Sequence, residues 1–211
     1  NTMAGFNITE LEAVNIILAS ADMMPVTQIT SPTTSEAVLA LGQLDNASAE
    51  IQAEGWNFNT TYDVELPLDG SSKCPTPDSS IRVIPTDNPA YIQKNDFIYD
   101  RSEATYVFKA PVRATVVYIN DWAELNYEVQ NYITKKAARR FHEYHVGSSD
   151  ALRSLVQDEQ EARRLILEAE MHAGRYSMFD APDMHAGLSY GNSLVGRASF
   201  NGADPFYTRD H

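Results

Sequence analysis

The sequence predicts an α+β protein: a helical bundle of about four helices, an inserted small antiparallel β module and an extended C-terminal arm. Three observations support this prediction. Apolar residues recur at helical spacing near both ends of the 211-residue chain, and short β-branched and aromatic runs fill its middle. After Gly174 no period is visible, although aromatic residues continue. We therefore expect a helical domain at 1–58 and 121–174, a β domain at 59–120 and an arm at 175–211.

Two amphipathic helices are expected first. Thr9-x-x-Glu12 is a capping-box pattern, in which each side chain binds the other residue's free backbone amide, so a helix begins there and should end near Met24-Pro25. A second helix should run from Ser35 to Gly55, because glycine readily closes a helix in the left-handed conformation. The apolar faces expected are Leu11, Val14 and Leu18 in the first helix, and Val38, Leu41, Ser48 and Ile51 in the second.

Short strands are expected between residues 59 and 120. The β-prone runs are YDVEL, SIRVI, DFIYD, TYVFK and VRATVVYI, and Pro, Gly, Asn and Asp separate them. Such runs are typical of an antiparallel sheet or sandwich.

Two longer helices should follow. The third extends from about Asn126 to Tyr144 and breaks at Gly147; the fourth extends from about Asp150 to Ala173 and ends at Gly174. On the fourth, Glu159 should pair with Arg163 and Arg164 with Glu168, since residues four apart are neighbours on a helix. The expected apolar faces are Val129, Tyr132, Ile133, Ala137, Phe141 and Tyr144 in the third, and Leu152, Leu155, Val156, Leu165, Ile166 and Ala169 in the fourth.

Composition narrows the possible functions. The net charge of −13 argues against wrapping nucleic acid, because phosphate contacts need clustered lysine and arginine. A single cysteine, Cys74, allows no internal disulfide and fits folding in a reducing cytoplasm. The longest apolar run, VNIILA, is too short to span a bilayer and no signal peptide precedes it, so we expect no membrane segment.

No constellation predicts catalysis or a bound metal. In RRFHEYHVG (139–147), His142 and His145 are three residues apart, whereas the HExxH zinc signature needs four, and no third ligand is nominated by spacing. Acid pairs such as those in DEQE (158–161) lie in an amphipathic helix, where acids usually form a solvated face. No nucleophile elbow or phosphate-binding loop is present. We expect no enzyme, no metal and no cofactor.

Charge and aromatic residues favour interaction surfaces. The chain has ten acids and no base before Lys73, and its first basic cluster is KKAARR, where Lys135, Lys136, Arg139 and Arg140 share one helix face. That face is either solvated with local salt bridges, or pairs with the base-free first helices within one subunit or across a subunit boundary. The aromatic residues after Gly174 indicate an arm that docks on a partner, the alternative being a loop folded over its own core.

Five stretches occur together in a fixed order: AVNIILAS (13–20), EGWNFN (54–59), FIYDR (97–101), YITKKAARRF (132–141) and DEQEARRLILEAEMHAGRYSMFD (158–180). With them the chain resembles the tail tubular protein A family, the head-to-tail adaptors of short-tailed bacteriophages. The resemblance spans about residues 11–180. It implies a helical bundle with an attached β domain, and a structural virion protein without a catalytic role.

The resemblance also implies partners and a location. The expected assembly is a homo-dodecamer joining the portal protein to the tail nozzle (of the tail tubular protein B type), with double-stranded genomic DNA passing through without specific binding. It would be made in the host cytoplasm and lie in the neck of the virion tail. A tail-associated polysaccharide hydrolase is the alternative. The expected subunit or portal interface comprises Lys135, Lys136, Arg139, Arg140, Arg163, Arg164, Tyr176, Met178, Phe179, Tyr190, Phe200, Phe206 and Tyr207.

Overall fold

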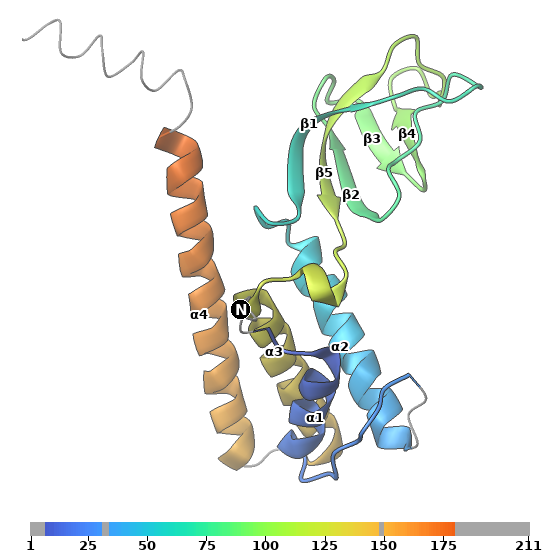
Figure 1. The fold of residues 1–211 in the computed structure, drawn as a ribbon. Helices are drawn as coiled ribbons and strands as arrows, with labels where there is room; N and C mark the ends of the chain where they lie inside the picture. The colour runs from blue at the N-terminus through green and yellow to red at the C-terminus, as the bar shows by residue number, and fades with distance from the viewer. Residues whose placement is uncertain (1–6, 31–33, 148–149, 180–211) are drawn as a thin grey trace, which may run out of the picture. The chain divides into compact units, whose positions relative to one another are not determined.

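A computed structural model describes the backbone at residues 7–30, 34–147 and 150–179, with side chains up to residue 172 (Figure 1). Its elements are α1 (Glu10–Ser20), α2 (Ser35–Ala53), β1 (Thr60–Leu66), β2 (Ser80–Pro85), β3 (Tyr91–Lys94), β4 (Phe97–Asp100), β5 (Val112–Tyr118), a short 3-10 helix η1 (Trp122–Glu124), α3 (Tyr127–His145) and α4 (Asp150–Phe179). Helices thus flank an antiparallel β region, which confirms the predicted α+β class.

The chain divides into two compact units, residues 1–171 and 172–211, and the boundary falls inside α4. All described side chains except that of His172 lie in the first unit. Its buried apolar residues form two separate cores, one among the helices and one in the β region. The boundaries expected for a helical and an inserted β domain stay a prediction.

The two N-terminal helices begin where the sequence indicates. The Thr9 hydroxyl accepts from the Glu12 amide, and the Glu12 carboxylate accepts from the Thr9 amide, so the capping box is confirmed. Thr34 caps α2, and Gly55 follows α2 with a φ of +82°, which glycine adopts without strain. Helix α1 ends at Ser20, earlier than expected.

The face that α2 buries differs from the predicted one. Small residues line the buried stripe together with Leu44 and Ile51, whereas Val38 is 52% exposed. Alanine takes the place expected for large apolar residues, because its small side chain lets helices approach closely. The stripe consists of Ala37, Ala40, Leu44, Ala47 and Ile51, at alternating spacings of three and four.

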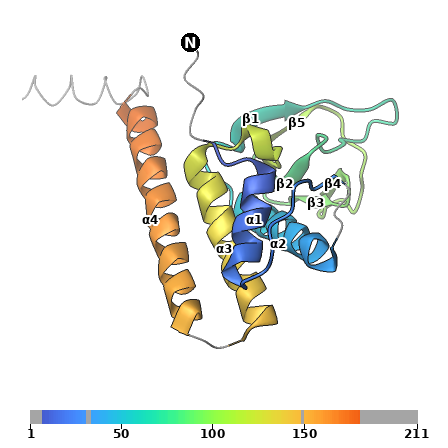
Figure 2. The same cartoon turned by 60° about the horizontal axis from the view of Figure 1, so that its bottom comes forward.

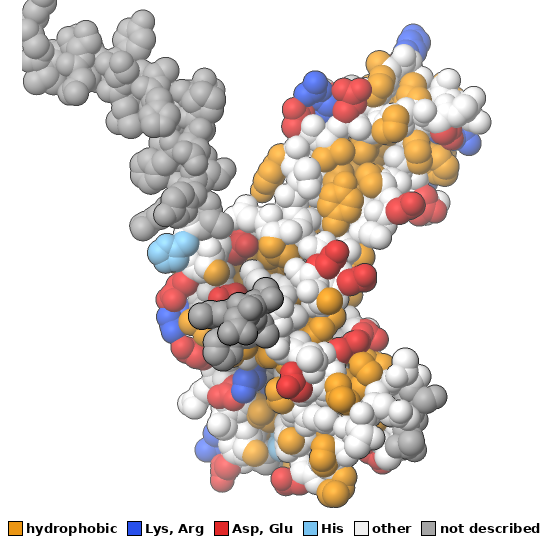
Figure 3. Space-filling model, in the orientation of Figure 1, with side chains coloured by type: hydrophobic (Ala, Val, Ile, Leu, Met, Phe, Trp, Pro, Cys, Tyr) orange, Lys and Arg blue, Asp and Glu red, His pale blue; other side chains and the backbone are white. Residues whose placement is uncertain are grey.

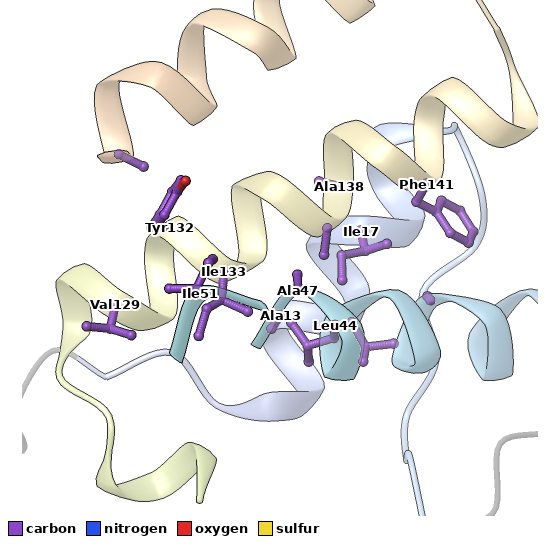
Figure 4. Packing of buried hydrophobic residues seen from close by; sticks show 14 of the residues in the cluster. Ala13, Ile17, Leu44, Ala47, Ile51, Val129, Tyr132, Ile133, Ala138 and Phe141 are labelled. Carbon is purple, nitrogen blue, oxygen red and sulfur yellow. The ribbon is translucent and has the colours of Figure 1, made fainter. Parts of the chain in front are cut away.

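The helical core lies between α1, α2 and α3, as Figures 2 and 4 show. Ile51 of α2 meets Ile133 of α3, and Ile17 of α1 lies beside Ala138 (Figure 4). Burying such a side chain contributes about 1.5–3 kcal/mol. The predicted face of α3 is confirmed except at Tyr144, which is 78% exposed.

Helix α4 departs from its prediction at two points. It continues through Gly174 to Phe179, because one glycine costs a helix only about 1 kcal/mol and its neighbours favour helix. Its fully buried apolar residues among those described are Ala162 and Ile166, whereas the predicted Leu165 is exposed. The other predicted members, Leu152, Leu155, Val156 and Ala169, are half-buried.

The β region consists of a three-stranded antiparallel sheet, ordered β1-β5-β2, and a β3-β4 hairpin. The hairpin closes at Lys94 and Phe97 through Asn95, whose φ of +55° asparagine tolerates well. Its β3 strand, YIQK, was missed. The predicted strand TYVFK is wrong, because Thr105 and Val107 form only isolated bridges, to Asp100 and Lys73.

A buried polar network holds the β region to the helices at the two places where the chain passes between them. The Gln52 side chain donates to the Asn120 carbonyl oxygen (3.1 Å) and accepts from the Asn120 amide (2.7 Å). Asn59 Nδ2 donates to the carbonyls of Gln52 and Tyr118, both at 2.8 Å. Gln52 is fully buried and Asn59 nearly so. These bonds therefore hold the loops before β1 and after β5 to the end of α2.

In the described part of the chain, no helix has the length and apolar character needed to cross a membrane.

Candidate interaction surfaces

The basic face of α3 is engaged within the chain. The Arg140 guanidinium donates to both carboxylate oxygens of Glu50 in α2, at 2.8 Å each. Lys136 Nζ lies 3.2 Å from the same carboxylate. These two bases therefore pair with a base-free N-terminal helix inside one subunit, which is one of the alternatives that the sequence left open.

The other two bases of this face hold α4. Lys135 Nζ donates to Asp158 at 2.9 Å, and Arg139 pairs with Glu159. Arg139 also reaches Glu143 at 2.9 Å on its own helix. We call the residues joining α2, α3 and α4 in this way the ion-pair seam: Glu50, Lys135, Lys136, Arg139, Arg140, Asp158 and Glu159.

Arg163 and Arg164 also have partners in the chain. Arg163 donates to the Tyr132 hydroxyl (3.0 Å) and lies 3.5 Å from Glu54. Its predicted pairing with Glu159 is replaced, because Glu159 is bound by Arg139 from α3. Arg164 pairs with Glu168, as predicted, and with Glu161 at 2.5 Å.

The seam carries the clearest electrostatic signature of the helices. Hydrogen bonds from Arg140 and Lys136, with the charges of both bases, lower the pKa of Glu50 from 4.5 to about 2. The same contacts raise the pKa of Arg140. Burial raises the pKa of the Tyr132 hydroxyl, which keeps it a neutral acceptor for Arg163. All six predicted basic residues are therefore neutralised by carboxylates among the described residues.

Apolar side chains remain uncovered on the outer sides of two helices. On α4 these are Leu165, Leu167 and Met171, and on α2 they are Val38 and Leu39. Figure 3 shows apolar side chains, in orange, interspersed with acidic ones on one face of the molecule. An exposed apolar side chain is common singly, but a run on one helix can mark an interface.

The predicted docking residues of the arm lie outside what the structure describes. Tyr190, Phe200, Phe206 and Tyr207 fall in the undescribed C-terminal residues, and the side chains of Tyr176, Met178 and Phe179 are likewise undescribed. Their assignment to an interface stays a prediction.

The two histidines of the HEYH stretch face different surroundings. His142 is buried, and its Nδ1 lies 2.5 Å from the Ser20 carbonyl oxygen, which ties α3 to the end of α1. His145 packs against the rings of Phe141 and Tyr144. Among the described residues, no group of three or more His, Cys, Asp or Glu side chains is placed to bind a metal ion.

A cavity of about 710 Å³ is lined by acidic residues. Glu10, Asp45 and Asp121 line it together with Trp122, and partial burial raises the pKa of Asp45. A second cavity of about 300 Å³ contains Asp87, Asp100 and Glu103. Asp100 there accepts from Ser102 and the Glu103 amide, and these bonds lower its pKa. A carboxylate held in this way stabilises its loop and is a poor general acid.

The bases of the α3 face were predicted from the sequence, but Glu50, which accepts from two of them, was not. Glu50 lies on α2 near the end of the buried stripe, and no motif distinguishes it from the other N-terminal acids. The absence of bases from both N-terminal helices was the available signal. Gln52 and Asn59 gave no signal at all.

Comparison with known proteins gives a specific family. The search of curated proteins finds no match. A family model described as Tail tubular protein matches residues 11–176, well over half of the chain and almost the span expected from the five matched stretches. Such proteins are structural components of the virion tail. The chain belongs to the tail tubular protein family.

Proposed function

We propose that the chain forms a homo-dodecameric ring that joins the portal to the tail nozzle at the neck of the virion and lets genomic DNA pass during ejection. The observation that carries this proposal is the family match over residues 11–176. In this proposal the helices build the ring, the β module meets the nozzle, and residues 175–211 dock on the portal or a neighbouring subunit.

The outer sides of the helices support a ring. A closed ring uses a heterologous interface, in which two different surfaces of each copy meet. Helices α2 and α4 both contact α3, and each leaves apolar side chains uncovered: Val38 and Leu39 on α2, Leu167 and Met171 on α4. Two different apolar surfaces on one subunit are what such an interface requires.

The ion-pair seam supports a positioning role for the basic residues. Its bases already have carboxylate partners, so direct pairing with another subunit would require breaking those bonds first. We assign Lys135, Lys136, Arg139 and Arg140 to fixing α2 and α4 against α3, which sets the two flanks that neighbours meet. Arg163 is assigned to holding α4 against Tyr132 of α3, and Arg164, whose partners lie on its own helix, to the outer side of α4.

The charge balance supports passage of DNA without binding. The net charge is −13, and the described bases of the helices have carboxylate partners. A wall that bound phosphate would slow ejection, whereas repulsion acts within about 8 Å at physiological salt. We propose no catalytic role, since the carboxylates of the described cavities have no arrangement that identifies a reaction.

Negative-stain imaging of the purified protein with and without its portal tests the proposal. We expect the protein to form rings on the portal. Protein that binds the portal without forming a discrete ring would contradict the proposal. Joint replacement of Lys135, Lys136, Arg139 and Arg140 by glutamine should impair assembly. Arg153→Gln is the control, because the Arg153 side chain is 85% exposed and its ion pair, with Asp150, lies within α4. Unchanged assembly by the fourfold variant would remove the basic face from the proposal.

A further inference from the structure

The β3-β4 hairpin carries aromatic side chains on its outer side. Strand β4 alternates, so Ile98 and Asp100 point inward and are buried, whereas Phe97 and Tyr99 are half-buried on the other side. Tyr106, from the segment after β4, contacts both rings, with centroids 6.5 Å from Phe97 and 4.8 Å from Tyr99. Three adjoining aromatic rings outside the core are unusual for a solvated hairpin.

Two lysines lie over these rings. Lys94 Nζ is 4.7 Å from the centre of the Tyr99 ring, and Lys73 Nζ is 5.6 Å from that of Phe97. Neither ammonium group has a carboxylate within ion-pair distance in the described chain. We call Lys73, Lys94, Phe97, Tyr99 and Tyr106 the hairpin face; the neighbouring Val107 is 55% exposed.

The hairpin face differs in charge from the described part of the helices. The bases of α3 and the described bases of α4 have carboxylate partners, whereas Lys73 and Lys94 of the hairpin face have none among the described residues. In a chain of net charge −13, these two ammonium groups beside aromatic rings are cations that no carboxylate of the described chain neutralises at ion-pair distance. Aromatic side chains are enriched in protein interfaces and supply many binding hot spots, and complementary charge speeds association.

We propose that the hairpin face docks on an acidic surface of the nozzle protein. This inference rests on the proposed function and specifies which side of the β module meets the next tail component. The occupant is a protein surface with clustered carboxylates, which would pair with Lys73 and Lys94 while its apolar groups cover Tyr99 and Tyr106.

The same geometry argues against nucleic acid as the occupant. Lys94 occupies a face of the Tyr99 ring and lies 6.0 Å from the Tyr106 ring centre, so base stacking would have to displace it. Two lysines are also a small phosphate-binding set on a strongly acidic chain.

The test measures binding of the full chain to purified nozzle protein, to purified portal protein and to a short DNA duplex. Tyr99→Ala should weaken nozzle binding about thirtyfold or more, as expected of a hot-spot aromatic residue. Lys94→Glu should slow association with the nozzle and reduce the salt dependence of that rate. Portal binding should be unchanged in both variants. Lys109→Glu, the same charge change on an exposed lysine of the β module, is the matched control.

Each contrary outcome has a distinct meaning. If the wild-type chain binds neither nozzle nor portal, the proposed function fails. If it binds the nozzle and Tyr99→Ala and Lys94→Glu bind as well, the inference alone is overturned. Equal loss in Lys109→Glu would show a general charge effect and overturn it too, as would loss confined to portal or DNA. Circular dichroism checks folding, and Lys94→Glu tests the face without removing a ring.

Discussion

Glu50→Gln should weaken the ion-pair seam measurably. A lowering of the Glu50 pKa from 4.5 to about 2 corresponds to about 3.4 kcal/mol at 1.36 kcal/mol per pH unit. Half of this side chain is exposed, so solvent screening reduces the expected loss in free energy of unfolding to about 1–2 kcal/mol. Urea denaturation followed by tryptophan fluorescence at pH 7 measures this loss.

The pH dependence of the loss tests its cause. The folded-state pKa is the lower one, so the stabilisation is fully present above pH 4.5 and is lost as the pH falls toward 2. At pH 3 the difference between wild type and Glu50→Gln should be less than half of that at pH 7.

Asp45→Asn on the same helix is the matched control for Glu50→Gln. Burial raises the Asp45 pKa, so its charge is unfavourable in the folded state and its removal should not destabilise the protein. A Glu50→Gln difference that is negligible at pH 7, or constant down to pH 3, would refute the electrostatic account of the seam.

Three further predictions follow from the structure. Gln52→Ala should lower the free energy of unfolding by about 1–3 kcal/mol, because it removes the partner of both backbone groups of the half-buried Asn120. Hydrogen exchange at Asn120 should quicken, whereas Gln43→Ala should have little effect. Truncation after Asp180 should leave the monomer folded, as circular dichroism would show, since the described cores lie earlier, but should weaken portal attachment; normal attachment would contradict the arm proposal. A reducing-sugar assay on host surface polysaccharide should show no release, and release that Asp45→Asn abolishes would favour the hydrolase alternative.

Local patterns predicted the helices well because the signals that end them are local. A capping box at Thr9, a threonine and a glycine around α2, and Gly147 after α3 each act within a few residues. The buried faces were harder to predict, since they depend on which neighbour a helix meets. Val38 and Tyr144 have suitable spacing but face away from the three-helix core.

Composition alone did not predict every strand of the β region. YIQK contains two polar residues and was not expected to form a strand, yet it forms β3 because it pairs with FIYD across the Asn95 turn. TYVFK reads as a strand, yet its backbone finds no continuous partner. The bases of α3 were visible in the sequence, but their division between Glu50 and α4 depends on tertiary packing, as do the lysines over the rings of the hairpin face.

Copy number in purified virions tests the central claim most directly. The claim is that identical subunits meet through different flanks to close a ring between head and tail. Quantitative mass spectrometry of intact particles should give this chain in the copy number of a dodecamer. A dodecameric portal would be present in the same copy number. A single copy per particle, or virions that join head to tail without the chain, would contradict the account.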